Sequence, residues 1–302
     1  MSLVIAEVLQ ALLAVVIAFL GLLVVISYIA SSKMLRPTRK VGSWSPHDLG
    51  FEYEKVEVRT QDGVILRGWL VKGGSDKTVL AIHGYTSSKW DEGYMKQILE
   101  MLARNNFNVA VFDMRAHGES TGEYTTLGFR ESEDVMRIID WLEERGLASK
   151  LGLIGYSMGG AITLMVSSMD PRVKAAVADS PYIDIRSSGK RWIARVRGVT
   201  GLLLRASYPL IVWLTAKRAR IDPEKLVMYG FADKIRIPLL IVAGEGDDLV
   251  PLEEIKTFYE RVRKVNEKAE LWITPSRHVS TITDSPREYE SKVLEFFNRW
   301  LA

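Results

Sequence analysis

The sequence predicts an α/β fold built on one eight-stranded, mostly parallel sheet with helices on both faces. Eight short apolar segments rich in strand-forming residues recur along the chain. From the third segment onward, stretches with helical periodicity separate them, as parallel strands with crossover helices require. The strands are expected at about residues 56–60, 65–72, 78–83, 108–113, 151–156, 174–179, 239–244 and 269–274.

The connections between these segments also follow fold-specific patterns. Helices are expected at about residues 91–104, 128–145, 157–169, 252–265 and 286–301. In the second helix, apolar side chains from Phe129 to Leu142 form one stripe, which we interpret as core packing. Gln61-Asp62-Gly63 joins the first two strands and is a hairpin signal, so this edge of the sheet should be antiparallel.

The amino-terminal segment is long and apolar enough to cross a membrane. Residues 11–30 contain no charged side chain, and twenty helical residues at about 1.5 Å each match the roughly 30 Å of a bilayer's hydrocarbon core. A cleaved signal peptide would begin with basic residues, but Glu7 is the only charged residue before position 30. A buried core helix is a third reading. We predict a retained transmembrane helix in segment 1–32, followed by a basic juxtamembrane linker at 33–50.

The residues after this helix predict its orientation. Lys33, Arg36, Arg39 and Lys40 follow with no acidic residue among them. Basic residues beside a span stay on the cytoplasmic side and can contact anionic headgroups. The chain is therefore expected to be a single-pass protein of the cell membrane, with its amino terminus outside and its larger part in the cytoplasm.

A basic and apolar insertion is expected between the strands ending near 179 and starting near 239. Residues 185–221 contain nine lysines and arginines and no acid, in a chain whose net charge is only +3. Tryptophans and aliphatic residues accompany them, a combination typical of helices at a membrane surface. An ordinary cap packed on the core is the alternative, and the two readings are compatible. The uncharged run 206–216 is short and contains Pro209, so a second span is not expected. Nucleic-acid binding fits this apolar content poorly.

A serine lies in a sharp turn between a predicted strand and a predicted helix. The motif is Gly155-Tyr156-Ser157-Met158-Gly159, after the apolar run 151–154 and before the apolar run 161–166. Glycines two residues on either side of the serine allow a strained turn that exposes its hydroxyl. The position of this motif predicts that Ser157 is a nucleophile.

A serine nucleophile needs a base, and the chain offers few. The four histidines are His47, His83, His117 and His278. Only His278 follows the serine, directly after the last predicted strand, whereas His83 and His117 stand beside glycines and are interpreted as loop-stabilising residues. The loop 244–251 supplies two candidate acids, Asp247 and Asp248, which spacing alone does not separate. The order serine, acid, histidine is that of an α/β-hydrolase.

Four motifs over residues 56–302 make the resemblance specific. They are His83-Gly84-Tyr85, the segment Asp113 to Ser120, the serine turn, and Asp247 to Pro251 with His278 downstream. The chain resembles α/β-hydrolase-fold serine hydrolases, in the branch of membrane-anchored esterases and monoacylglycerol-lipase-like proteins. The resemblance implies a catalytic domain at 51–302 with a helical cap or lid at about 184–222. It selects Asp247 as the acid, with Asp248 as the fallback, and differs mildly at Ala116, where relatives have glycine.

The resemblance also implies a reaction and the residues that perform it. His278 would take the proton of Ser157, Asp247 would orient the imidazole, and the backbone amides of Tyr85 and Met158 would form the oxyanion hole. No metal or organic cofactor is expected. The chain has no cysteine, P-loop, HExxH motif or dinucleotide fingerprint.

The expected activity is hydrolysis of a carboxylic ester of an acyl chain, of the monoacylglycerol-lipase or carboxylesterase type. The predicted span and the apolar insertion would place the site where lipid acyl esters occur. Alternatives are an acyl-protein or acyl thioesterase, then a serine peptidase, then a non-catalytic membrane-tethered ligand-binding protein. The richness in Glu, Lys and Arg is common in heat-adapted proteins and suggests a thermophilic source.

Overall fold

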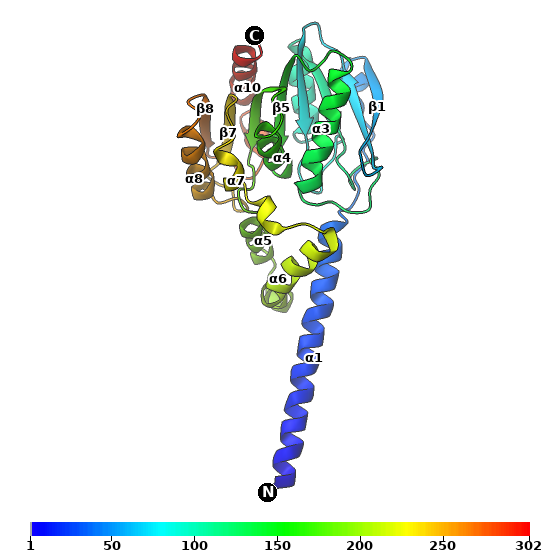
Figure 1. Ribbon diagram of the computed structural model, residues 1–302, viewed down its shortest axis with the longest axis vertical. Helices are drawn as coiled ribbons and strands as arrows, with labels where there is room; N and C mark the ends of the chain where they lie inside the picture. The colour runs from blue at the N-terminus through cyan, green and yellow to red at the C-terminus, as the bar shows by residue number, and fades with distance from the viewer. Residues whose placement is uncertain (1) are drawn as a thin grey trace.

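Eight strands form a single sheet, which confirms the predicted α/β-hydrolase fold class. The computed structural model describes residues 2–302, so Met1, the first residue of the expected segment 1–32, lies outside it. The spatial order of the strands is β1-β2-β4-β3-β5-β6-β7-β8 (Figure 1). Their bounds are β1 Tyr53–Arg59, β2 Ile65–Val71, β3 Lys77–Ile82, β4 Asn108–Phe112, β5 Lys150–Tyr156, β6 Val173–Asp179, β7 Leu239–Gly244 and β8 Ala269–Thr274.

The direction of the strands brings several loops to one edge of the sheet. β1 and β2 form the predicted antiparallel hairpin, in which Arg59 pairs with Ile65, and β2 is also antiparallel to β4. The other neighbouring strands are all parallel. The loops after β3, β5, β6, β7 and β8 therefore leave the sheet at the same edge, where open α/β sheets place their sites.

Helices cover both faces of this sheet. Their bounds are α1 Ser2–Leu35, α2 Met95–Arg104, α3 Phe129–Glu143, α4 Met158–Ser167, α5 Ile185–Ala194, α6 Gly198–Ala219, α7 Tyr229–Ala232, α8 Leu252–Arg263, α9 Thr281–Asp284 and α10 Pro286–Trp300, with 3-10 turns at Pro46–Leu49 and Pro223–Leu226. Helix α2 begins four residues later than expected from the sequence. The Asp91 carboxylate accepts hydrogen bonds from the amides of Gly93 and Tyr94 and holds residues 91–94 in a turn.

Two hydrophobic layers hold the helices against the sheet. On one face, α3, α4 and α8 pack through side chains such as Ile138, Ile162 and Phe258. On the other, α2 and α10 pack through Leu99 and Phe296. Helix α4 is buried on all sides, which explains its uniformly apolar sequence. This central helix follows Ser157 directly, so the serine sits on the most enclosed part of the fold.

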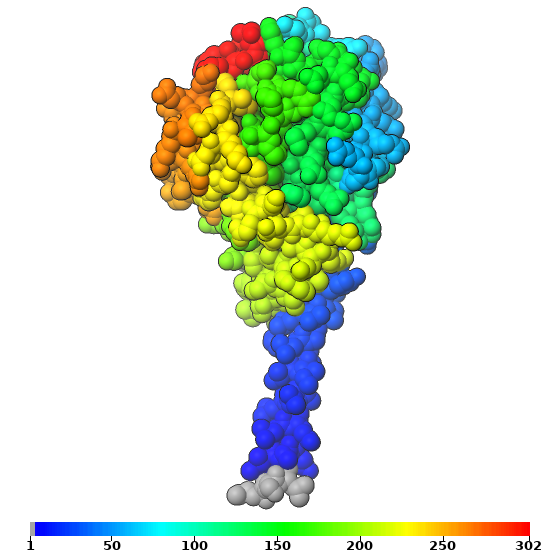
Figure 2. Space-filling view, in the orientation of Figure 1, coloured from blue at the N-terminus to red at the C-terminus, as the bar shows by residue number. Residues whose placement is uncertain are grey.

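Helix α1 projects from the rest of the molecule, on the same side as α5 and α6 (Figures 1 and 2). Its side chains from Val4 to Leu22 are exposed, whereas Ser27, Ser31 and Leu35 are fully buried at four-residue intervals. This spacing places one stripe of α1 against α6. Arg218 of α6 donates to the hydroxyls of Ser31 and Ser32, at 3.2 and 2.8 Å.

Two helices, α1 and α6, have the length and apolar composition of a membrane span. The mean hydropathy is 3.0 for Val4–Leu35 and 1.4 for Gly198–Ala219. Helix α6 continues through Pro209, so the uncharged run 206–216 is only part of a longer helix than the sequence suggested. The polypeptide reaches α6 from β6, by way of α5, and continues after α6 to β7. These two strands are hydrogen-bonded neighbours. A single crossing by α6 would place these two paired strands on opposite sides of a bilayer, which one continuous sheet does not allow.

Candidate active site

The turn between β5 and α4 places Ser157 in a strained backbone conformation. Its φ angle is 53°, in the left-handed region that non-glycine residues rarely occupy. A Cβ at Gly155 would lie 2.1 Å from the carbonyl oxygen of Gly159, and a Cβ at Gly159 would lie 2.1 Å from that of Ile82. Side chains larger than hydrogen do not fit at these positions. The glycines therefore permit the turn that presents the serine hydroxyl at the sheet edge.

Three residues predicted from the sequence come together at this edge. His278 Nε2 lies 2.9 Å from Ser157 Oγ, and His278 Nδ1 lies 2.7 Å from Asp247 Oδ2. The Asp247 carboxylate accepts a hydrogen bond from Nδ1–H, which leaves Nε2 unprotonated and able to take the serine proton. Its other oxygen accepts the amides of Leu249 and Val250, at 2.8 and 2.9 Å. This arrangement can activate the hydroxyl for attack on an electrophile.

The structure separates the two candidate acids of the loop after β7. The Asp247 side chain is 1% exposed and faces His278. The Asp248 side chain is 68% exposed and pairs with Arg195 of the α5–α6 connection. Only Asp247 is in hydrogen-bond contact with the imidazole. The geometry thus favours the same acid as the family resemblance, and Asp248 lies at the surface.

The loop after β3 lies directly beside the serine. A Cβ at Gly84 would be 3.4 Å from Ser157 Cβ, so the backbone of this loop approaches the serine closely. The Tyr85 amide follows Gly84, and the Met158 amide begins α4 next to Ser157. Among the residues that the structure describes, neither amide donates to an internal acceptor. Both are available to donate to a negative oxygen formed at the serine.

The two histidines beside glycines stabilise loops and do not contact Ser157. His83 Nδ1 donates to Gly84 O at 2.7 Å, and its Nε2 accepts the Met114 amide at 2.9 Å. His117 Nδ1 donates to Arg115 O at 2.9 Å, and its Nε2 accepts the Thr86 amide at 3.3 Å. Burial lowers the pKa of both imidazoles to about 4. Both are therefore neutral at pH 7, as an accepting ring nitrogen requires.

Asp113 and Arg115, two charged residues of the motif after β4, lie in separate buried networks. Asp113 accepts the Lys89 ammonium at 2.6 Å, and Lys89 itself lies over the ring of Trp90. Arg115 pairs with Asp134 from α3. Between residues 2 and 302, no three His, Asp or Glu side chains are grouped to hold a metal ion. Asp113 also accepts the amide of Glu119 at 2.8 Å, and this hydrogen bond stabilises the turn after β4.

A second buried acid that sequence reasoning missed lies behind the site. The Asp179 side chain is fully buried at the end of β6 and accepts hydrogen bonds from Ser180 at 2.8 Å and from Tyr289 at 2.9 Å. Ser180 in turn accepts the amide of Val279, next to His278. Burial raises the pKa of Asp179 to about 6. The only available sequence signal was its position at the end of a predicted strand.

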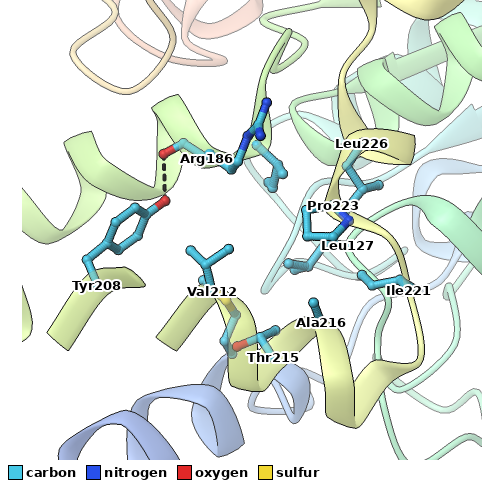
Figure 3. Close-up of a pocket in the computed structure, with 11 residues that line it drawn as sticks. Leu127, Arg186, Tyr208, Val212, Thr215, Ala216, Ile221, Pro223 and Leu226 are labelled. Atoms are coloured by element: carbon cyan, nitrogen blue, oxygen red, sulfur yellow. Dashed lines mark hydrogen bonds between the residues drawn. The ribbon is translucent and has the colours of Figure 1, made fainter. Parts of the chain in front are cut away.

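An apolar cavity of about 40 Å³ lies between the cap, the core and the end of α1 (Figure 3). The Tyr208 hydroxyl of α6 closes one side by donating to Arg186 O at 2.6 Å. Met34 of α1 and Leu127 of the loop before α3 contribute to its walls. The remaining lining residues are mainly aliphatic: Ile185, Val212, Thr215, Ala216, Ile221, Pro223 and Leu226.

The chain resembles known hydrolases in sequence and in structure. Residues 73–229 match the family described as serine aminopeptidase, S33. The esterase Pf2001 of Pyrococcus furiosus is 39% identical, with a TM-score of 0.78 over 89% of this chain and 100% of that one. The uncharacterized peptidase YuxL of Bacillus subtilis is 26% identical over 82% of this chain, which spans only 38% of YuxL. An uncharacterized membrane protein of Saccharomyces cerevisiae, YNL320W, is 24% identical over 74% of this chain and 73% of its own length.

Proposed function

The chain belongs to the serine aminopeptidase S33 family of α/β-hydrolases, and we propose that it is a membrane-anchored serine ester hydrolase that acts on single-chain lipid esters. One observation carries the proposal: a single imidazole, that of His278, is hydrogen-bonded to both Ser157 and Asp247. The likeness to an esterase that is 39% identical supports ester chemistry within this hydrolase family.

The proposed reaction proceeds through an acyl-enzyme. His278 Nε2 takes the proton of Ser157 Oγ, which attacks the ester carbonyl carbon. The carbonyl oxygen becomes negative and accepts the amides of Tyr85 and Met158. The intermediate then collapses, and the leaving alcohol departs with the proton from His278. Water repeats the sequence on the acyl-enzyme, releasing the carboxylic acid and restoring the serine, while Asp247 stabilises the imidazolium in both halves.

The apolar cavity supports an acyl-chain substrate. Its walls are aliphatic apart from the Arg186 and Thr215 side chains and the Tyr208 hydroxyl, and apolar walls favour binding of a hydrocarbon chain. The volume of about 40 Å³ is smaller than a long chain, so binding requires α6 to move away from the core. We propose that the acyl chain enters the cavity as this movement opens it.

The outer surface of the cap supports contact with a bilayer. Trp192, Val199, Leu202 and Trp213 are each more than half exposed, although α5 and α6 also carry many basic residues. Exposed apolar side chains among arginines and lysines favour the interface of an anionic membrane. With α1 across the bilayer, α6 would lie at the membrane surface, next to the buried stripe of α1. We propose the orientation given by the basic residues after α1, with the domain in the cytoplasm, and the yeast relative named a membrane protein supports the anchoring.

The test is the turnover of monoacylglycerols in vesicles by the full-length protein and by Ser157→Ala. The variant should lose at least about 10⁴-fold in kcat because the nucleophile is absent. It should also lose labelling by a fluorophosphonate probe. Ser168→Ala, which removes a hydroxyl at the end of the same helix, is the matched control and should keep full activity. Undiminished turnover by the Ser157 variant would refute the assignment.

The family description and the YuxL relative favour a second candidate, peptide hydrolysis. The same residues can cleave an amide, with the amine as leaving group protonated by His278. Aminoacyl p-nitroanilides, p-nitrophenyl esters, an acyl-CoA and a monoacylglycerol distinguish the candidate activities. A kcat/KM for the anilides above that for all acyl esters would replace the ester proposal with the peptidase, and a preference for acyl-CoA would favour a thioesterase.

A further inference from the structure

The carboxyl-terminal end of α1 is hydrogen-bonded to the loop that carries the Tyr85 amide. The last carbonyls of a helix lack intrahelical donors. Here Pro37 has no N–H to offer to Lys33 O. The Tyr85 hydroxyl donates its one hydrogen at this helix end, with Met34 O at 3.1 Å as the nearer acceptor and Lys33 O at 3.4 Å. Burial raises the pKa of this phenol to about 12, so it stays protonated and donating.

The residues just after α1 hold a second loop. The guanidinium of Arg39 donates to backbone carbonyls of residues 117–122, at 3.2 Å to Gly118 O and 2.8 Å to Gly122 O, and also to Ser120 O. Leu35 O accepts the amide of Thr125 at 2.9 Å. Several carbonyls of one loop thus depend on one side chain from the α1 end.

This second loop in turn contacts the first. His117 lies within the segment that Arg39 holds, and its Nε2 accepts the Thr86 amide, one residue after Tyr85. Thr86 has a φ of 60° and Ala116 a φ of 61°, so both loops contain a backbone conformation that external contacts must maintain. The α1 end is therefore linked to residues 85 and 86 by two routes, one through the Tyr85 hydroxyl and one through Arg39 and His117.

We propose that the α1 end, residues 33–39, positions the oxyanion loop, residues 84–87, and that Tyr85 and Arg39 are positioning residues for hydrolysis. The inference rests on the proposed function, because it assigns the Tyr85 amide to the oxyanion hole. Movement of this amide by a fraction of an ångström weakens its hydrogen bond to the negative oxygen and leaves substrate binding in the cavity intact. The helix that anchors the protein is on this account also a support of the active site.

The first test is Tyr85→Phe in the full-length protein, assayed with a p-nitrophenyl ester in detergent micelles. Loss of the hydroxyl should lower kcat about tenfold with KM unchanged, because a displaced donor affects the transition state alone. Tyr229→Phe is the matched control. Its hydroxyl also donates to a backbone carbonyl, Glu254 O at 3.3 Å, but far along the chain from the oxyanion loop. The control should keep wild-type kcat.

The second test addresses the other route through Arg39. Arg39→Gln should lower kcat with KM unchanged, and Arg39→Lys should retain more activity because its ammonium still reaches carbonyls. Arg261→Gln serves as the control. Arg261 of α8 pairs with Asp233 at the surface, away from both loops, and the kcat of this variant should stay within about twofold of wild type.

The outcomes separate this inference from the proposed function. If wild type neither hydrolyses esters nor reacts with fluorophosphonate, the proposed function fails. If wild type is active and both Tyr85→Phe and Arg39→Gln keep wild-type kcat, the positioning role is refuted and the hydrolase stands. A thermal midpoint lowered in these variants with kcat unchanged also refutes it, since that pattern marks a purely structural contact.

Discussion

At the scale of single residues, burial keeps two histidines near the site, His83 and His117, uncharged. His83 and His117 are enclosed by loops, and each uses one ring nitrogen to accept a backbone amide. A protonated imidazole could not accept these hydrogen bonds, and burial also disfavours its charge. His278 differs from them because its side chain is partly exposed and bridges a carboxylate and a hydroxyl. Identical side chains thus serve different roles through their surroundings.

The buried histidines predict a loss of stability in mild acid. Their pKa values in the folded protein, about 4, lie below the ordinary value of 6.5, so the unfolded chain binds more protons between these limits. Their contribution is complete above pH 6.5 and is lost as the pH falls toward 4. Denaturant unfolding at pH 7 and pH 4.5 measures this. His117→Gln should show a smaller loss than wild type, and an equal loss would contradict the account.

The two aspartates of the loop after β7 predict opposite effects. Asp247→Asn keeps the side-chain shape but cannot fix the imidazole with Nε2 unprotonated, so kcat should fall by about 10⁴-fold. Asp248→Asn removes an exposed pair with Arg195 and should change kcat by less than about twofold. Ester hydrolysis under saturating substrate compares them. A larger loss from the Asp248 variant would reassign the acid.

At the scale of elements, local patterns predicted the sheet well and the cap less well. The bounds of each strand agree with the prediction to within a few residues, because apolar runs bounded by glycines and polar turns determine the strands locally. The site residues lie at strand ends, so their convergence also followed from topology. In contrast, α6 continues through Pro209 because Tyr208 and Ile211 on either side pack against Ile193 of α5. Tertiary packing here outweighs the local helix-breaking effect of proline.

Contacts between distant residues could not be predicted from one sequence. The Tyr85 hydroxyl and Met34 O are 51 positions apart, and Tyr289 meets Asp179 across 110 positions. Neither pair belongs to a motif or a periodic pattern. Their side chains meet only because the sheet places α1, the loop after β3 and α10 as it does. The nucleophile turn was predictable because its glycines and serine are adjacent in the chain.

The exposed face of α6 predicts an effect confined to lipid substrates. Leu202→Glu with Trp213→Glu places two charges where apolar side chains are 63% and 56% exposed. Turnover of monoacylglycerol in vesicles should fall several-fold, because charges oppose insertion into the interface. Hydrolysis of a soluble acetyl ester should not change. Thr257→Glu, at an exposed position of α8, is the control. Equal loss on both substrates would mean that the variant disturbs the site itself.

At the scale of the whole molecule, α1 and the cap lie at the same end, and the chain's carboxyl terminus lies at the other (Figure 1). The sheet edge that carries Ser157 faces the cap, because the loop after β6 leaves this edge and continues into α5. With α1 across a bilayer, the site would face the membrane and the carboxyl terminus would point away from it. The described shape therefore agrees with a substrate taken from the membrane.

The basic residues after α1 predict the orientation of the whole protein. In sealed cells, a tag at the carboxyl terminus should be protected from added protease, and a tag before α1 should be cleaved. Permeabilised cells supply the control, in which both tags should be digested. Cleavage of the carboxyl-terminal tag in sealed cells would reverse the proposed topology.

One stripe of α1 is buried against the rest of the protein, which restricts rotation of this helix relative to the catalytic domain. The stripe consists of Ser27, Ser31 and Leu35. A flexible connection to α1 would allow Ser157 to reach lipids of the nearest leaflet or of neighbouring vesicles. With α1 across a bilayer, a rigid connection would instead fix the height and tilt of the site above one leaflet. Each molecule would then deplete lipids from that leaflet alone, and esters in the opposite leaflet would have to flip across before they were cleaved.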